Sequence, residues 1–145
     1  MQELVDHILY VANQNRKRIT HLQLHKVTYF TFGYLIREKY NEMAESLYKN
    51  NRFEAWKYGP VIPEIYDEFK MYTSTPIIYN GKKSNRLNDV PNINEVILSL
   101  INQDVFDLVN ISHRHNFWFR NKQSISNNRR PKYSYAELVK EFSIK

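Results

Sequence analysis

The segment from Leu22 to Tyr40 constrains the fold more than any other part of this 145-residue chain. Its apolar side chains are spread around the whole circumference of a helix, and they include Leu24, Val27, Phe30, Phe32, Leu35 and Ile36. A helix that is apolar on nearly every side is normally a buried one, so we expect this helix at the centre of the molecule. Thr20 and Gln23 have the spacing of a capping box at its start. Gly33 inside it costs about 1 kcal/mol relative to alanine, which predicts that a neighbouring element approaches closely there.

Shorter helices are expected before and after the central one. Residues 2–16 have an apolar stripe at helical spacing, and the pattern Ser134-Tyr135-Ala136-Glu137 predicts a capping box before a final helix. Pro63 suits the first turn of a helix, where its missing N–H group is no loss. The further predicted helices span residues 63–72, 92–101 and 105–109.

The remaining segments are predicted to be a small β element and two irregular connections. Residues 46–48 and 53–56 have the composition of a short hairpin, with residues 49–52 as its polar tip. Residues 73–91 and 121–133 are predicted to be loops. No linker is long enough to divide the chain. We therefore expect a mainly α fold, a compact single-domain helical bundle over residues 1–145 around a buried central helix, with a small β-hairpin.

The composition limits the class of protein. The chain has no cysteine, which excludes disulfides, thiolate zinc sites and thiol nucleophiles. It has no run of about 18 apolar residues, and the pattern of a secretory signal is missing at its N-terminus. These features lead us to expect a cytoplasmic protein that does not enter a membrane.

The net charge of +6 belongs to one part of the chain. Residues 1–110 hold thirteen basic and thirteen acidic residues, whereas residues 111–145 hold eight basic and two acidic ones. From Ile111 to Tyr135 there is no acid, and the basic residues are Arg114, Arg120, Lys122, Arg129, Arg130 and Lys132. Such a segment indicates an acidic partner surface or a nucleic-acid backbone.

Patterns for metal binding and catalysis are weak. His21 and His25 have the four-residue spacing that places two imidazoles on one face of a helix, but no third ligand is obvious nearby. His113 and His115 also lack further ligands, so ordinary surface or core histidines are the favoured interpretation of both pairs. The chain contains no phosphate-binding loop and no nucleophile elbow. We expect no metal, no cofactor and no enzymatic activity, and keep a hydrolase or metal-dependent enzyme as the weakest alternative.

The stretch FEAWKYGPVIPEIYDEF, residues 53–69, concentrates aromatic residues around a Gly-Pro pair. Gly59 and Pro60 are predicted to form a structural corner, and Trp56, Tyr66 and Phe69 to fold that corner onto the central helix.

A corner alone does not explain Lys57, which stands between two large amphipathic rings. Trp and Tyr beside a cation have the composition of a binding hot spot. Lys57 and Tyr58 are therefore candidates for an exposed functional surface.

Aromatic residues also interrupt the basic segment, where Phe117, Trp118 and Phe119 stand between Arg114 and Arg120. Stacking rings beside guanidinium groups are the chemistry that binds single strands. The favoured alternative is that Phe117 and Trp118 anchor the segment into the core, because an outward-facing Phe-Trp-Phe run would promote aggregation.

Three motifs together resemble a known family. LQLHKVTYF at residues 22–30 is similar to that family's Leu-Gln-Lys-Leu-Leu-Tyr-Phe helix, and residues 53–70 match its central signature almost throughout. Ser112-His113 and then Phe117-Trp118 stand where the family has Thr-His and then Pro-Trp. On these motifs the chain resembles the Panacea antitoxin domain family, the phage-associated GepA-like and SocA-like proteins, over nearly its whole length. His25, Ser112 and Phe117 depart from the family pattern.

The resemblance implies an antitoxin encoded beside a toxin in bacteria, their phages or prophages, with a role in phage defence. Such domains neutralise structurally unrelated toxins, commonly by direct binding, and toxic small alarmone synthetases that attack translation are among the partners. One member acts as a proteolytic adaptor. We therefore predict neutralisation of a cognate protein toxin by direct binding. The alternatives are a proteolytic adaptor and a nucleic-acid-binding regulator that uses the basic C-terminal third.

Partner and site predictions follow from these motifs. Binding to nucleic acid is expected to be at most weak and non-specific, and the assembly is either a homo-oligomer or a toxin–antitoxin hetero-oligomer. The residues predicted to hold the motif in shape are Trp56, Gly59, Pro60 and Tyr66. The residues predicted to bind the partner are Lys57, Tyr58, Glu64, His113, Arg114 and Trp118.

Overall fold

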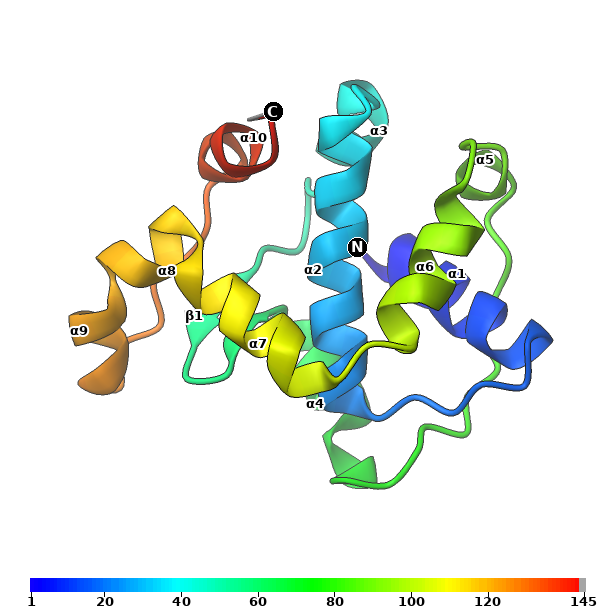
Figure 1. Cartoon of the computed structure of the whole chain (residues 1–145), viewed down its shortest axis with the longest axis horizontal. Coiled ribbons are helices and arrows are strands. Elements are labelled where there is room, and N and C mark those ends of the chain that lie inside the picture. Colours follow the sequence, from blue (N-terminus) through cyan, green and yellow to red (C-terminus); the bar gives the residue numbers. More distant parts are fainter. Residues whose placement is uncertain (144–145) are drawn as a thin grey trace.

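The computed structural model describes residues 1–143 (Figure 1). In that range the chain forms ten α-helices, one 3-10 turn and one two-stranded sheet, so the predicted mainly α fold with a small hairpin is confirmed. The elements in chain order are α1 (Gln2–Gln14), α2 (His21–Arg37), α3 (Asn41–Leu47), β1 (Glu54–Trp56), β2 (Gly59–Val61), α4 (Pro63–Phe69), the 3-10 turn η1 (Lys70–Tyr72), α5 (Asn85–Asn88), α6 (Ile93–Ile101), α7 (Val105–Arg114), α8 (Asn116–Arg120), α9 (Lys122–Ser126) and α10 (Tyr135–Phe142).

The central helix is α2, which stands in the middle of Figure 1 between α1 and α6 on one side and α7 on the other. It also contacts α3, α4, α10 and strand β2. The predicted capping box is present: Thr20 Oγ1 accepts a hydrogen bond from the Gln23 amide at 3.3 Å, and Gln23 Oε1 accepts one from the Thr20 amide at 2.9 Å. Most of the predicted apolar residues of α2 are fully buried, and Phe30 is partly buried.

Gly33 is the point at which α10 approaches α2. A Cβ atom at this position would overlap the ring of Phe142. Phe142 in turn lies edge-on to Tyr29, with 5.2 Å between the ring centroids. The close approach predicted from this glycine is therefore confirmed.

The hairpin lies later in the chain than predicted. Residues 46–48 belong to the end of α3 and the residue after it, and β1 pairs with β2 around the two-residue turn Lys57–Tyr58. The proposed strand is helical because Ala44 and Leu47, at helical spacing, are both buried against the core. Tyr48 then ends the helix with its hydroxyl group bonded to the Phe53 amide at 2.9 Å.

Two predicted loops contain short helices. Within residues 73–91, Ser84 Oγ caps α5 by accepting a hydrogen bond from the Leu87 amide at 3.2 Å, and Leu87 is buried. Within residues 121–133, α9 is anchored by buried Ile125. One buried apolar side chain in each short helix is too weak a pattern to predict that helix from sequence.

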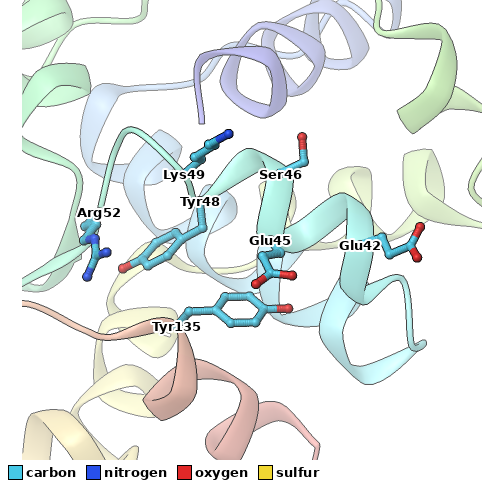
Figure 2. Close-up of a pocket in the computed structure, with 7 residues that line it drawn as sticks. All are labelled: Glu42, Glu45, Ser46, Tyr48, Lys49, Arg52 and Tyr135. Atoms are coloured by element: carbon cyan, nitrogen blue, oxygen red, sulfur yellow. The ribbon is translucent and has the colours of Figure 1, made fainter.

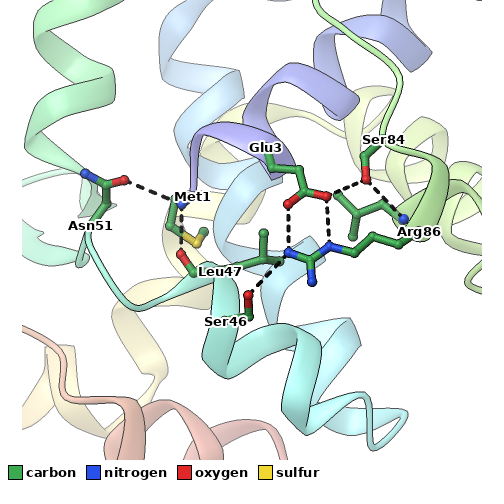
Figure 3. Close-up of polar contacts among 8 residues, drawn as sticks. Met1, Glu3, Ser46, Leu47, Asn51, Ser84 and Arg86 are labelled. Atoms are coloured by element: carbon green, nitrogen blue, oxygen red, sulfur yellow. Dashed lines mark hydrogen bonds and ion pairs between the residues drawn. The ribbon is translucent and has the colours of Figure 1, made fainter.

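Polar contacts around α1 join three distant parts of the chain (Figure 3). The Met1 ammonium group donates hydrogen bonds to the Leu47 carbonyl at 2.8 Å and to Asn51 Oδ1 at 3.5 Å. Glu3 accepts two bonds from Arg86 at 2.7 and 2.9 Å, which links α1 to α5. No helix within residues 1–143 combines the length and apolarity needed to cross a membrane.

Candidate partner-binding site

Both edges of the β1–β2 hairpin are occupied. Beside β1, the Ala55 amide donates to the Pro131 carbonyl at 2.8 Å, and the Tyr133 amide donates to the Phe53 carbonyl at 2.9 Å. Ala55 stands opposite Pro60, in a pair whose backbone groups point out of the hairpin. Pro60 therefore loses no ladder hydrogen bond through its missing N–H group.

The carbonyl of Pro60 accepts a hydrogen bond from a buried lysine of the central helix. Lys26 Nζ, from α2, donates to it at 2.6 Å, and the whole Lys26 side chain is buried. Among residues 1–143 no carboxylate forms an ion pair with this amine. Burial lowers the pKa of Lys26 well below its ordinary value. The hairpin thus covers a lysine for which nothing in the sequence predicted burial.

Gly59 fits this arrangement for two reasons. Its φ of +101° lies in the left-handed region that favours glycine. A Cβ atom there would also lie 2.6 Å from Ser112 Oγ and 3.0 Å from Lys26 Nζ. The predicted corner at Gly59 and Pro60 is wrong in one respect, because the chain reverses at Lys57–Tyr58 and the Gly-Pro pair lies in strand β2. There β2 closes over the ends of two buried polar side chains.

Trp56 reaches the central helix through a second ring. Its centroid is 4.9 Å from that of Tyr66, and Tyr66 stacks on His25 of α2 with 6.0 Å between centroids. Trp56 itself is half-buried, and its Nε1 donates to Glu54 Oε1 at 2.9 Å. Phe69 is buried in the core.

The turn of the hairpin carries two of the predicted binding residues. Lys57 and Tyr58 are both exposed, with 51% of the Tyr58 surface accessible. The turn is supported from α8, where Trp118 Nε1 donates to the Trp56 carbonyl at 2.8 Å. The Trp118 ring also stacks on His113 of α7, at 3.7 Å between centroids and 15° between planes. The structure thus brings together Lys57, Tyr58, His113 and Trp118, which we call the hairpin-tip surface.

The other two predicted residues differ in position. Arg114 is exposed at the end of α7, next to His113 in the chain. Glu64 is exposed in the first turn of α4, and its charge acts on the Met1 ammonium group, whose pKa burial lowers and nearby Glu3 and Glu64 raise. Over residues 1–143 no hydrogen bond or ion pair joins Glu64 to the hairpin-tip surface.

A groove of about 460 Å³ opens beside the tip. Its most informative feature is Arg130, whose guanidinium carbon lies 3.9 Å from the centroid of the Trp56 ring. We call this hollow the basic groove, and it is lined by Leu22, Trp56, Lys57, Tyr58, Val61, Ile125, Asn128, Arg129 and Arg130. The sequence indicated the basic segment but gave no sign that it meets Trp56.

The aromatic residues of α8 divide between the core and the surface. Phe117 and Trp118 are half-buried and pack against the core, with Phe117 4.5 Å from Tyr133 between ring centroids. Their predicted anchoring role is confirmed. Phe119 is 56% exposed, and the Lys122 amine lies 4.5 Å from its ring centroid.

The two histidine pairs do not form a metal centre in the described part of the chain. Within residues 1–143, no group of three or more His, Asp or Glu side chains is placed to hold a metal ion. His21 and His25 contact each other edge-on at 5.5 Å between centroids. Burial lowers the pKa of both rings, and lowers it strongly for His25.

A second hollow lies elsewhere, between α3 and the start of α10 (Figure 2). It has a volume of about 560 Å³, and charged side chains of both signs line it beside Tyr48 and Tyr135. None of the residues predicted to bind a partner belongs to it.

Comparison with known sequences agrees with the motifs. The family described as "Antitoxin SocA-like, Panacea domain" matches residues 8–119, from within α1 to within α8. Searches of curated proteins and of solved structures found no match. The matched stretch is most of the chain and contains the central helix, the hairpin and α7. The chain belongs to the family of SocA-like antitoxins that carry a Panacea domain.

Proposed function

We propose that this protein is the antitoxin of a bacterial or phage toxin–antitoxin system and neutralises its cognate protein toxin by binding it directly. Membership of an antitoxin family supports a toxin as partner in general terms. The proposed toxin is one that attacks translation, such as a toxic small alarmone synthetase, as the resemblance implies. The action is occlusion, by a single domain of residues 1–145 in the cytoplasm, with neither catalysis nor a cofactor.

The observation that carries the proposed contact surface is the exposed turn on a fixed hairpin. Lys57 and Tyr58 face outward, while both edges of the hairpin and the backbone before the turn are bonded to the rest of the molecule. A partner can therefore bind the turn with little loss of backbone freedom, which favours affinity. A tyrosine beside a cation has the composition of a hot spot.

The proposed surface consists of Lys57, Tyr58, His113, Arg114 and Trp118. In this surface Trp118 supports the turn, because its Nε1 donates a hydrogen bond to the Trp56 carbonyl. His113 supports Trp118 by stacking on its ring. Glu64 is left out, since within residues 1–143 it has no hydrogen bond or ion pair to the tip, and its charge acts on Met1.

Growth rescue and co-purification test the proposal. The reading frame adjacent to this gene should be toxic when expressed alone, and co-expression with this protein should restore growth and yield a complex of the two proteins. Rescue without a complex, together with a fall in the level of the toxin protein, would instead support the proteolytic adaptor.

A nucleic-acid-binding regulator is the second candidate, and the basic groove is the observation that favours it. Arg129, Arg130 and Lys57 stand beside Trp56 and Tyr58, which combines cations with rings. If the toxin's transcript falls while no protein complex forms, this candidate takes first place.

A further inference from the structure

The Arg130 guanidinium group lies against an aromatic ring and has no acidic partner within residues 1–143. It stacks over Trp56 at 3.9 Å from the ring centroid, and Arg130 is exposed. Within residues 1–143 neither Arg130, Arg129 nor Lys57 forms an ion pair. A stacked guanidinium keeps its N–H edges free, and these edges match the two oxygens of a carboxylate.

The rest of the basic groove suits an acidic segment that also has apolar side chains. No Asp or Glu is among its lining residues, which include apolar Leu22, Val61 and Ile125 next to the cations. Its volume of about 460 Å³ is in the range of sites that enclose a ligand of a few side chains. Charge and size together point to a short stretch of chain with acidic and apolar residues.

The faces of Trp56 argue against a nucleic-acid strand. Bases bind single-strand proteins by stacking on free aromatic faces. Here Arg130 covers the Trp56 ring, Tyr66 packs against it at 4.9 Å, and Glu54 accepts the indole N–H. A base that stacks on Trp56 would have to displace one of these neighbours, whereas a carboxylate can add to Arg130 without displacing any.

The hairpin edges also limit how a segment can bind. The edge of β1 is bonded to residues 131–133, and the Pro60 carbonyl of β2 is bonded to Lys26. Addition of a partner strand to this sheet is therefore blocked. A segment in the groove is held by side chains.

We propose that the basic groove binds an extended acidic segment of a protein, with a carboxylate on Arg130 and an apolar side chain beside Ile125. Only the identification of that protein as the toxin rests on the proposed function. To the proposed function, the inference adds that the toxin must present an acidic segment with apolar side chains.

A random dodecapeptide phage library tests the groove without the toxin. The library is first depleted on the Arg130→Glu variant and then selected on the wild-type protein. The selected peptides should be enriched in Asp and Glu, and the affinity of the best of them is measured by fluorescence anisotropy. We expect at least tenfold weaker binding to Arg130→Glu and an intermediate loss with Arg130→Lys, which keeps the charge but not the planar fork.

Arg37→Glu is the matched control, because Arg37 is exposed at the far end of α2 and undergoes the same charge change. It should bind the peptide as the wild type does, and thermal melting should show all variants folded. Three results would each overturn the inference. The selected peptides are not enriched in Asp and Glu, or Arg37→Glu loses as much affinity for the peptide as Arg130→Glu does. The third is that a twelve-nucleotide dT strand displaces the bound peptide at a lower concentration than unlabelled peptide does.

The outcomes separate this inference from the proposed function. If acidic peptides bind as expected but no toxin is bound, the proposed function fails and the groove stands. If the peptide test fails while the wild-type protein binds and neutralises the toxin, the groove inference fails and the proposed function stands. If the peptide test succeeds but Arg130→Glu binds the toxin as well as the wild type does, the groove stands and its ligand is a protein other than the toxin.

Discussion

Replacing Gly59 with alanine tests how the central signature is built. The substitution has two costs in free energy, one from the backbone conformation and one from the contacts of the new side chain. Holding a non-glycine residue at a φ of +101° costs about 1–3 kcal/mol. The added Cβ atom would also lie 2.6 Å from Ser112 Oγ and 3.0 Å from Lys26 Nζ, so both groups must move.

Moving those groups disturbs two hydrogen bonds. Ser112 Oγ donates to the Val109 carbonyl at 2.7 Å, and losing such a bond costs about 1 kcal/mol. Lys26 donates to the Pro60 carbonyl at 2.6 Å, and a buried donor left without its partner costs about 1–3 kcal/mol. We expect Gly59→Ala to lower the free energy of unfolding by about 3–7 kcal/mol, a large part of a small domain's stability.

A double-mutant cycle separates the contact from the backbone effect. Ser112→Ala removes the Oγ atom that the new Cβ would meet, so Gly59→Ala should cost about 1–2 kcal/mol less in that background. Urea unfolding followed by tryptophan fluorescence measures all four proteins. Additive effects within about 0.5 kcal/mol, or a loss below about 1 kcal/mol for Gly59→Ala alone, would refute this account of the signature.

Three further predictions concern acid stability, the approach of α10 and nucleic acid. His25 is neutral in the fold because burial lowers its pKa well below 6.5, so the unfolded chain binds the extra proton. The unfolding free energy should therefore fall as pH drops from 7 to 5, by up to about 1 kcal/mol per pH unit from this ring, and His25→Leu should flatten that slope in urea titrations. Gly33→Ala should lower the melting temperature, because the new Cβ atom would overlap the Phe142 ring. Adding Phe142→Leu to that variant should partly restore the melting temperature. Equal melting temperatures for the wild type, Gly33→Ala and the double variant would contradict the close contact. A dT oligonucleotide should bind no tighter than about 1 μM at 150 mM salt, and tighter binding in anisotropy assays would favour the regulator.

Local patterns in the sequence were enough for the features that depend on local chemistry. The Thr20 capping box, the buried central helix and the first turn of α4 at Pro63 follow from residues a few positions apart. Ser134 also caps α10 as predicted, since its Oγ accepts a hydrogen bond from the Glu137 amide at 3.1 Å. The Glu137 side chain instead pairs with Arg120 at 2.9 Å, a partner that the local pattern cannot reveal.

The errors lie where distant segments decide the structure. A proline inside a strand argues against that strand, yet Pro60 belongs to β2 because its backbone faces out of the hairpin toward Lys26. Burial of Lys26 depends on a strand more than thirty residues further along the chain. Likewise, the stacking of Arg130 on Trp56 joins the segment after α9 to the hairpin, so the basic groove could not be predicted from either segment alone.

The affinity of the purified partner for tip variants tests the central claim most directly. Calorimetric titration should give a tight complex with the wild-type protein and with Lys39→Glu, a control for charge reversal at an exposed lysine beyond α2. Lys57→Glu and Tyr58→Ala should each bind at least tenfold more weakly, a loss of about 1.4 kcal/mol, with melting temperatures unchanged because both side chains are exposed. Wild-type affinity in both tip variants would contradict direct binding through the hairpin-tip surface.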